Sequence, residues 1–550
     1  MTKRSVAIFS LVSVLLLLFF WRGGGRRSPL LPEVKLVVFV VVDQFADEYL
    51  DRFDSVFTGG IRLLVDEGVV LRKVLHPHEV TATCPGHASI VTGAQPSTHG
   101  IVNNWWYDRK AKEVRYCVDD GAYSRSPDLL QVNALPDWIK DRYPRSRSYA
   151  VSGKDRSAIM MAGKEGDAAL WYDKSSGMMA SSRYYFRRGY PWWLSEFNKE
   201  GGAKKYFGRL WTPLVESAEL FKKTGTFTFD FGDFPETFPY ALGGPEPAPG
   251  PSFFADVYNS PFVDELTFNF AERLLTEFQL GNGEGIDYLA LSLSALDTVG
   301  HGAGANSPKV FDVLMRIDRG LESFIALLEE KVGLDRTLIV FTSDHGIPPF
   351  PEALQHYGMS AHFGEESKTA ARVSASDISC LQRAHFFGKE SGQQELFEAP
   401  LYVKEEFRAR DGLVTKKISD KLKGALGECA PVSAVYDSRD IEEYRFKGTR
   451  DSSSLATAKR NFFRGRSPDF SVLTKPYYSL TPGRGINHGT PYRYDAEVPV
   501  IFFGANVSRN TTLNSERRLW VTDIAGTVAR LLGVSASPEA KKGLMMVSDE

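Results

Sequence analysis

The sequence predicts an α/β protein with a doubly wound, mainly parallel sheet and helices on both of its faces. Three observations favour this class. Apolar runs rich in Val and Leu recur along the 550-residue chain and are typical of strands buried on both faces. Segments with helical periodicity alternate with these runs. Several runs also end in an acidic residue, at the edge where open α/β sheets bind their ligands.

The first half of the pattern begins with a strand at residues 34–42, "VKLVVFVVV", which runs directly into Asp43. A helix and then a strand are expected in "GGIRLLVDEGVVLRKV". A Leu-rich strand is expected to begin at Asp287 and to end at Asp297, in "DYLALSLSALD". The strands that run into Asp43 and Asp297 would each place an acidic side chain at the carboxyl edge of the sheet.

The second half continues with an amphipathic helix from Ser307 to Val332. Ser307 and Pro308 are suited to the start of that helix, and apolar residues recur along it at spacings of three and four. A strand at 337–342 then leads into Asp344 and His345. A last strand and helix are expected in "AEVPVIFFG" and "WVTDIAGTVARLLGV".

Two regions interrupt the alternation within the domain expected at 34–550. Residues 165–255 are rich in aromatic side chains and contain the stretch "GGPEPAPGPSFF", and residues 350–480 carry many charges and little periodicity. We expect both to be insertions, one of which could form a cap over the sheet edge.

Residues 1–33 are predicted to direct export. Lys3 and Arg4 precede a mostly apolar run from Ser5 to Trp21, which has the layout of a signal peptide. Because no convincing small-residue cleavage site follows and the run is close to the length of a membrane span, an uncleaved anchor is the alternative.

The charge balance and the cysteines limit the function classes. With 66 basic and 68 acidic residues the net charge is -2, which gives no overall field for binding nucleic acid. The cysteines, Cys84, Cys117, Cys380 and Cys429, are scattered and contain no CxxC pair, so they favour neither a thiolate zinc site nor a disulfide-dense scaffold. One or two disulfides are possible, with the pairing left open.

The acidic strand ends can be combined into a metal site. Taken alone, Asp43 could cap a helix, and a single Asp–His pair is commonly a cap with its partner. Three carboxylates at one edge would repel one another without cations, which favours metal ions. Two ions need about six oxygen or nitrogen ligands. The candidates are Asp43, Asp297, His301, Asp344, His345 and His488.

Thr83, in "TATCPGHASIVTG", is the candidate nucleophile. A threonine hydroxyl near neutral pH is protonated, and a bound dication would lower its pKa. Pro85 suits the first turn of a helix that would direct its N–H groups at an anion. The alternative is that Thr83 is a plain N-cap.

The motifs "VVVDQF", "TCPGHASIVTGAQPSTHGIVNNWWYDR", "DTVGHG", "SDHG" and "NHGT" occur in an order that resembles the alkaline phosphatase superfamily. The resemblance is to its type I phosphodiesterase/nucleotide pyrophosphatase branch and to the PafA-like bacterial alkaline phosphatases. It implies an alkaline phosphatase-like catalytic domain with two zinc ions and a phosphothreonine intermediate. By this resemblance one zinc is held by Asp43, Asp344, His345 and Thr83, and the other by Asp297, His301 and His488.

The stretch "VSGKDRSAIMMAG" bears on the substrate. Lys154 and Arg156 resemble the cation pair that contacts phosphoryl oxygens in PafA-like enzymes, and Asn104 matches a hydrogen-bonding asparagine of that family. Taken alone, Lys-Asp-Arg would be a solvated turn. The expectation is therefore a phosphate-monoester hydrolase, periplasmic or attached to the outer face of the inner membrane of a bacterium. A phosphodiesterase on the same scaffold and a non-catalytic, membrane-tethered binding protein are the alternatives.

Overall fold

The central element of the protein is an eight-stranded sheet. The structure is a computed structural model, and it describes residues 34–215, 238–244, 247–349, 354, 397–399, 401–429, 431–448, 450–478, 486–507, 519–541 and 543. The strand order is β2-β16-β11-β1-β10-β5-β6-β7. In chain order these strands are β1 (Leu36–Val42), β2 (Val69–Leu75), β5 (Ser148–Ser152), β6 (Ala168–Asp173), β7 (Met178–Ala180), β10 (Asp287–Leu293), β11 (Thr337–Thr342) and β16 (Glu497–Gly504).

The middle of the sheet is parallel, as predicted. Strands β11, β1, β10, β5 and β6 pair in parallel, whereas β16, β2 and β7 join antiparallel at the two sides. The register brings the carboxyl ends level, because Val42 is aligned with Leu293 and Ser292 with Ser152. Loops that follow these strands therefore meet at one edge.

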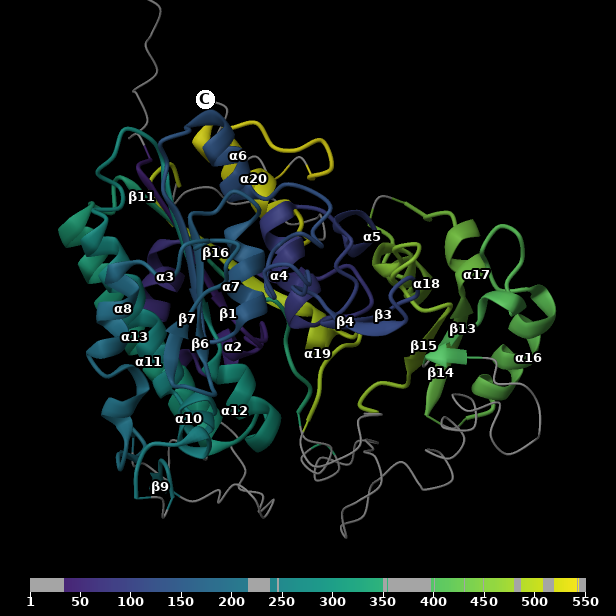
Figure 1. Cartoon of the computed structure of the whole chain (residues 1–550), viewed down its shortest axis with the longest axis horizontal. Helices are drawn as coiled ribbons and strands as arrows, with labels where there is room; N and C mark the ends of the chain where they lie inside the picture. The colour runs from purple at the N-terminus through teal and green to yellow at the C-terminus, as the bar shows by residue number, and fades with distance from the viewer. Residues whose placement is uncertain are drawn as a thin grey trace, which may run out of the picture.

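Helices cover both faces of this sheet (Figure 1). One face packs against α3 (Gly60–Glu67), α8 (Trp192–Lys199), α10 (Pro251–Tyr258), α11 (Phe262–Glu277), α12 (Ala295–Ala303) and α13 (Pro308–Lys331). The other face packs against α4 (Thr83–Thr92), α6 (Leu135–Arg142), α7 (Asp155–Ala162) and α20 (Asp523–Leu532). Strand β1 serves both layers, because Val38 and Val40 belong to the first core and Val37 and Phe39 to the second.

The Leu-rich strand is shorter than predicted. Strand β10 ends at Leu293, and Asp297 lies in the first turn of α12 rather than at the end of the strand. The cause is Asp264, whose Oδ1 accepts hydrogen bonds from the N–H groups of Ser294 at 2.7 Å and Ala295 at 3.1 Å. These bonds satisfy backbone donors at the point where the chain turns into the helix. The predicted helix at 307–332 is confirmed as α13, with Ser307 as its N-cap and Pro308 at its start.

A separate lobe lies beside the sheet and α5 (Pro96–His99) (Figure 1). It contains β12 (Phe397–Ala399), β13 (Tyr402–Val403), α16 (Lys416–Gly427), β14 (Val432–Asp437), α17 (Ser438–Glu443), α18 (Ser454–Asn461) and β15 (Phe470–Thr474). A hairpin of β3 (Trp105–Asp108) and β4 (Glu113–Tyr116) lies between the lobe and α4. The lobe falls within the second expected insertion, 350–480. Within the first, 165–255, β6 and β7 belong to the central sheet.

The predicted export segment, 1–33, lies outside the described residues. Among the residues that are described, every helix is too short or too polar to cross a membrane.

Candidate active site

Four adjacent parallel strands deliver charged side chains to one edge of the sheet. Asp43 follows β1, Asp344 follows β11, Asp297 lies in α12 just after β10, and Lys154 follows β5. All four side chains are buried. The predicted meeting of the three carboxylates at this edge is therefore what the structure shows, and a lysine joins them.

Three histidines face these carboxylates with Nε2, and each ring is held in place through Nδ1. The Nδ1 atoms of His301, His345 and His488 lie 2.6, 3.0 and 2.7 Å from the carbonyl oxygens of Ile486, Gly346 and Thr81. Because a carbonyl oxygen can only accept, each Nδ1 carries the proton and donates it. Burial lowers the pKa of His345 and His488, so these two rings are neutral and direct the lone pair of Nε2 at the carboxylates, which is the tautomer that metal-binding histidines use. Burial would also lower the pKa of His301, but Asp297, whose Oδ1 lies 3.1 Å from Nε2, raises it.

Two groups of side chains present ligand atoms within 4.8 Å of one another. The first is Asp297, His301 and His488, as predicted. The second is Asp43, Asp297 and His345, so Asp297 reaches both groups. Asp344 borders the second group, because its Oδ2 lies 3.4 Å from His345 Nε2, while Asp43 Oδ1 lies 3.3 Å from the same atom.

These residues fit divalent cations. Within the described part of the chain, Asp43 Oδ1 and His345 Nε2 are buried and have no hydrogen-bond partner. A lone pair on Nε2 and a carboxylate oxygen repel each other unless a cation or a proton lies between them. Carboxylate oxygen and imidazole nitrogen together are the donor set of zinc.

Lys154 neutralises part of this negative charge. Its Nζ lies 2.6 Å from Asp43 Oδ2 and also pairs with Asp297. Burial would lower the pKa of Lys154, but Asp297 and Asp43 raise it above its ordinary value. Burial together with the charges of Asp297 and Asp344 raises the pKa of Asp43 to about 8. The site therefore holds more negative charge than one lysine can stabilise.

Thr83 is the first residue of α4, and Ala82 occupies the N-cap position without a side-chain cap. The N-cap alternative for Thr83 is therefore wrong. Its buried hydroxyl oxygen instead accepts a hydrogen bond from Arg156 Nη2 at 3.3 Å. Gly86, in the same turn, allows close packing: a Cβ there would lie 2.3 Å from the carbonyl oxygen of Asp344. The helix start is thus pressed against the strand end that carries Asp344.

Asn104 supports the same turn. Its Oδ1 accepts a hydrogen bond from the N–H of Cys84 at 2.8 Å, which leaves the amide Nδ2 as a donor. Cys84 and Cys117 form a disulfide, and Cys117 donates its N–H to the carbonyl of Asn104 at 3.0 Å. The pairing that the sequence left open is thereby assigned for these two cysteines. Cys380 lies outside the described residues.

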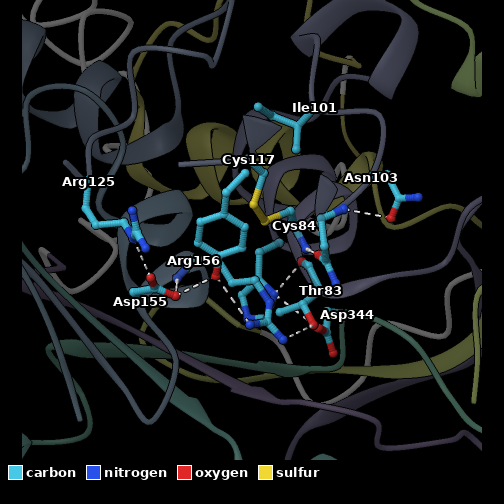
Figure 2. The surroundings of a disulfide bond; sticks show 12 residues. Thr83, Cys84, Ile101, Asn103, Cys117, Arg125, Asp155, Arg156 and Asp344 are labelled. Carbon is cyan, nitrogen blue, oxygen red and sulfur yellow. Dashed lines mark hydrogen bonds and ion pairs between the residues drawn. A yellow bond between two sulfur atoms is a disulfide. The ribbon is translucent and has the colours of Figure 1, made fainter. Parts of the chain in front are cut away.

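A chain of hydrogen bonds holds Arg156 from behind (Figure 2). Arg156 Nη1 donates to the Tyr116 hydroxyl at 3.4 Å, and that hydroxyl donates to Asp155 Oδ1 at 2.6 Å. Arg125 donates to the other oxygen of Asp155 at 2.8 Å. Arg156 is therefore anchored rather than solvated, so the interpretation of Lys-Asp-Arg as a free surface turn is wrong.

Sequence reasoning missed several members of the site. Gln44 donates from Nε2 to Asp297 Oδ1 at 2.7 Å and from its N–H to Asp344 Oδ1 at 3.2 Å. Tyr116, Asp155 and Arg125 were also missed. The only sequence signal for these residues is that some of them adjoin residues already singled out: Gln44 follows Asp43, and Tyr116 precedes Cys117.

His87 supports the turn that carries Thr83. Its Nδ1 lies 2.9 Å from the Thr83 carbonyl oxygen and 3.1 Å from Asp344 Oδ2.

Comparisons with known proteins agree with this geometry. A model of the type I phosphodiesterase/nucleotide pyrophosphatase family matches residues 37–494. The chain is 27% identical to the alkaline phosphatase PafA of Elizabethkingia meningoseptica, over 93% of this chain and 94% of that protein. It is 28% identical to the alkaline phosphatase PhoV of Synechococcus elongatus, over 91% and 90%. The crystal structure of wild-type PafA superposes with a TM-score of 0.78 at 25% identity, over 93% of this chain and 98% of that one.

Proposed function

The chain belongs to the type I phosphodiesterase/nucleotide pyrophosphatase family, and from this premise we propose that it is an alkaline phosphatase that hydrolyses phosphate monoesters with Thr83 as the nucleophile. The observation that carries the proposal is the position of the Thr83 hydroxyl. It lies buried at the start of α4, within 3.3 Å of Arg156 and at the sheet edge that carries the carboxylates and histidines. Alkaline phosphatases that align along nearly the whole chain support this activity.

Two zinc ions per chain are part of the proposal. Asp43, Asp344 and His345, with Thr83, would hold one, and Asp297, His301 and His488 would hold the other, with Asp297 within reach of both. Bound there, zinc would lower the pKa of a hydroxyl or a water and stabilise negative charge on oxygen.

The chain's own residues define the rest of the reaction. The Thr83 oxygen attacks phosphorus as the bond to the leaving oxygen breaks, which gives a phosphothreonine and an alcohol that takes up a proton. Water then attacks the same phosphorus, releases inorganic phosphate and restores the hydroxyl. Arg156, which already contacts the Thr83 oxygen, and the Nδ2 amide of Asn104 would donate hydrogen bonds to the phosphoryl oxygens.

The cation pair favours monoesters over diesters. A monoester presents three non-bridging oxygens with two negative charges, whereas a diester replaces one of these oxygens by a second substituent. Arg156 contacts the Thr83 oxygen, and Lys154 pairs with Asp43 at the same edge of the sheet, so both cations would interact with that extra charge. A preference for bis-aryl over aryl phosphate would overturn this assignment in favour of the phosphodiesterase.

The decisive experiment compares Thr83→Ala with Thr83→Ser in a steady-state panel of mono- and diesters at alkaline pH with zinc. We expect the alanine variant to lose turnover while its melting temperature stays close to wild type, and the serine variant to keep part of the activity. Full activity in Thr83→Ala would exclude the nucleophile assignment. Metal analysis of the purified protein should give close to two zinc per chain; no binding after zinc loading would favour the non-catalytic alternative.

The location is also a proposal. The basic and apolar start of the chain supports export to the periplasm or attachment to the outer face of the inner membrane. Fractionation of cells that express the full chain would test it, since cytoplasmic protein would contradict export. Salt-resistant membrane association would favour the anchor.

A further inference from the structure

A cavity of about 500 Å³ lies between the β3–β4 hairpin and the lobe. Its lining includes His488 and Asn103, the neighbour of Asn104, so the cavity adjoins the candidate active site. Aromatic residues of the hairpin and the lobe, among them Trp105 and Tyr402, form other parts of the wall, and Glu79 contributes a carboxyl group. None of these aromatic or acidic residues has a part in the proposed reaction.

Glu79 is the unusual member of this lining. It lies between β2 and α4, four residues before Thr83, and its Oε1 accepts a hydrogen bond from the hydroxyl of Ser471 on β15. Within the described part of the chain this carboxylate forms no salt bridge. Burial raises the pKa of Glu79 to about 7. At alkaline pH the cavity therefore contains an ionised carboxylate whose negative charge lacks a cationic partner.

The aromatic wall connects this carboxylate to the phosphoryl end of the site. Trp105 is 54% exposed, and its ring packs on that of Tyr116 with a centroid distance of 4.3 Å. Tyr116 in turn contacts Arg156, which contacts Thr83. If the phosphoryl group of an ester reaches Arg156, the exposed ring of Trp105 lies nearby, on the other side of the Tyr116 ring.

We propose that this cavity binds the organic part of the substrate, and that it selects phosphate monoesters whose organic part is an aromatic or apolar body with an ammonium group. The inference rests on the proposed phosphatase function and names its substrate class. Aromatic faces and an uncompensated carboxylate together are the chemistry that recognises an ammonium ion. The aromatic wall provides contact area for the body, and Glu79 provides the charge.

The test uses three aryl phosphates with the same ring: phenyl phosphate, tyramine O-phosphate with an ammonium, and 3-(4-phosphooxyphenyl)propionate with a carboxylate. The variant is Glu79→Gln, and Glu113→Gln, an exposed glutamate on β4, is the matched control. At pH 8.5 we expect wild-type kcat/KM to be highest for the tyramine ester. Glu79→Gln should lower the tyramine-to-phenyl ratio about tenfold and raise the carboxylate-to-phenyl ratio, whereas the control should change neither.

Ratios within one preparation are independent of the fraction of folded enzyme, so a poorly folding variant still gives an answer. Unchanged ratios in Glu79→Gln, or equal changes in the control, would overturn the proposal. Calorimetry with free tyramine separates it from the proposed function. Glu79-dependent binding of tyramine by a protein that hydrolyses none of the esters would support the cavity and refute the phosphatase. Hydrolysis of all three esters at rates that do not depend on Glu79 would support the phosphatase and refute the proposed role of the cavity.

Discussion

Replacing Tyr116 by phenylalanine tests whether the hydrogen-bond chain behind Arg156 positions it for the phosphoryl group. The change removes one oxygen that accepts from Arg156 at 3.4 Å and donates to Asp155 at 2.6 Å. A hydrogen bond to a charged group contributes about 1.5–3 kcal/mol, and the long contact to Arg156 puts the loss near 1 kcal/mol. We therefore expect kcat/KM for aryl phosphate to fall about fivefold.

The folded state should tolerate this change. Asp155 keeps its bonds to Arg125 at 2.8 Å and to the N–H of Arg156 at 2.7 Å, so no buried charge is left without a partner. The control is Tyr123→Phe, which removes a hydroxyl outside this chain of bonds. Both variants should melt within a few degrees of the wild type.

The assay is the ratio of kcat/KM for aryl phosphate to that for bis-aryl phosphate, measured from pH 7 to 10. Because Arg156 is expected to act mainly on the extra charge of the monoester, the ratio should fall in Tyr116→Phe. Burial raises the pKa of Tyr116, so the hydroxyl stays protonated and the loss should be constant across this pH range. An equal loss on both esters, or a loss that varies with pH, would refute the positioning role.

Three further outcomes follow from the packing. Gly86→Ala would place a Cβ 2.3 Å from the carbonyl oxygen of Asp344, so activity should fall at least tenfold, and wild-type kcat would contradict the close approach. Replacing Cys84 and Cys117 by serine opens a link across 33 residues and should cost about 4 kcal/mol of unfolding free energy in denaturant curves, an effect that reductant should reproduce in the wild type. Burial raises the pKa of Glu79 from 4.5 to about 7, so ionisation of this group lowers the stability of the folded wild type as the pH rises through that range. Glu79→Gln removes this loss, so the variant should be more stable than the wild type at pH 8 but not near pH 4. A gain that does not change with pH would show that burial does not raise this pKa.

The sheet and the carboxylates at its edge were predictable because one physical rule places both. Strands buried on both faces must be apolar along their whole length, so an aspartate directly after such a run marks the carboxyl end. Asp43 follows this rule directly, and Asp344 follows β11 after one intervening residue, Ser343. Asp297 lies four residues beyond the end of β10, because Asp264 binds the backbone N–H groups at the start of α12 and no local sequence pattern reveals a carboxylate that acts from another helix.

The supporting residues were not predictable for a related reason. Tyr116 reaches Asp155 from the end of β4 and Arg125 from the segment that follows, and the Cys84–Cys117 link joins α4 to the residue after β4. Hydrogen bonds between residues 30 or more positions apart have no period or spacing in the sequence. The motif "KDR" shows Asp155 only as the residue between two cations, whereas in the structure its carboxylate holds the chain behind Arg156.

The loop that carries His488 connects the two halves of the site. The carbonyl of Ile486 fixes the ring of His301, and the N–H of Ile486 donates to the His301 carbonyl at 3.0 Å. The ring of His488 is fixed by the carbonyl of Thr81, two residues before Thr83. One loop therefore sets the orientation of two candidate ligands and also contacts the segment that presents the nucleophile. Changes in this loop should alter metal affinity and the position of Thr83 together, because the same hydrogen bonds determine both.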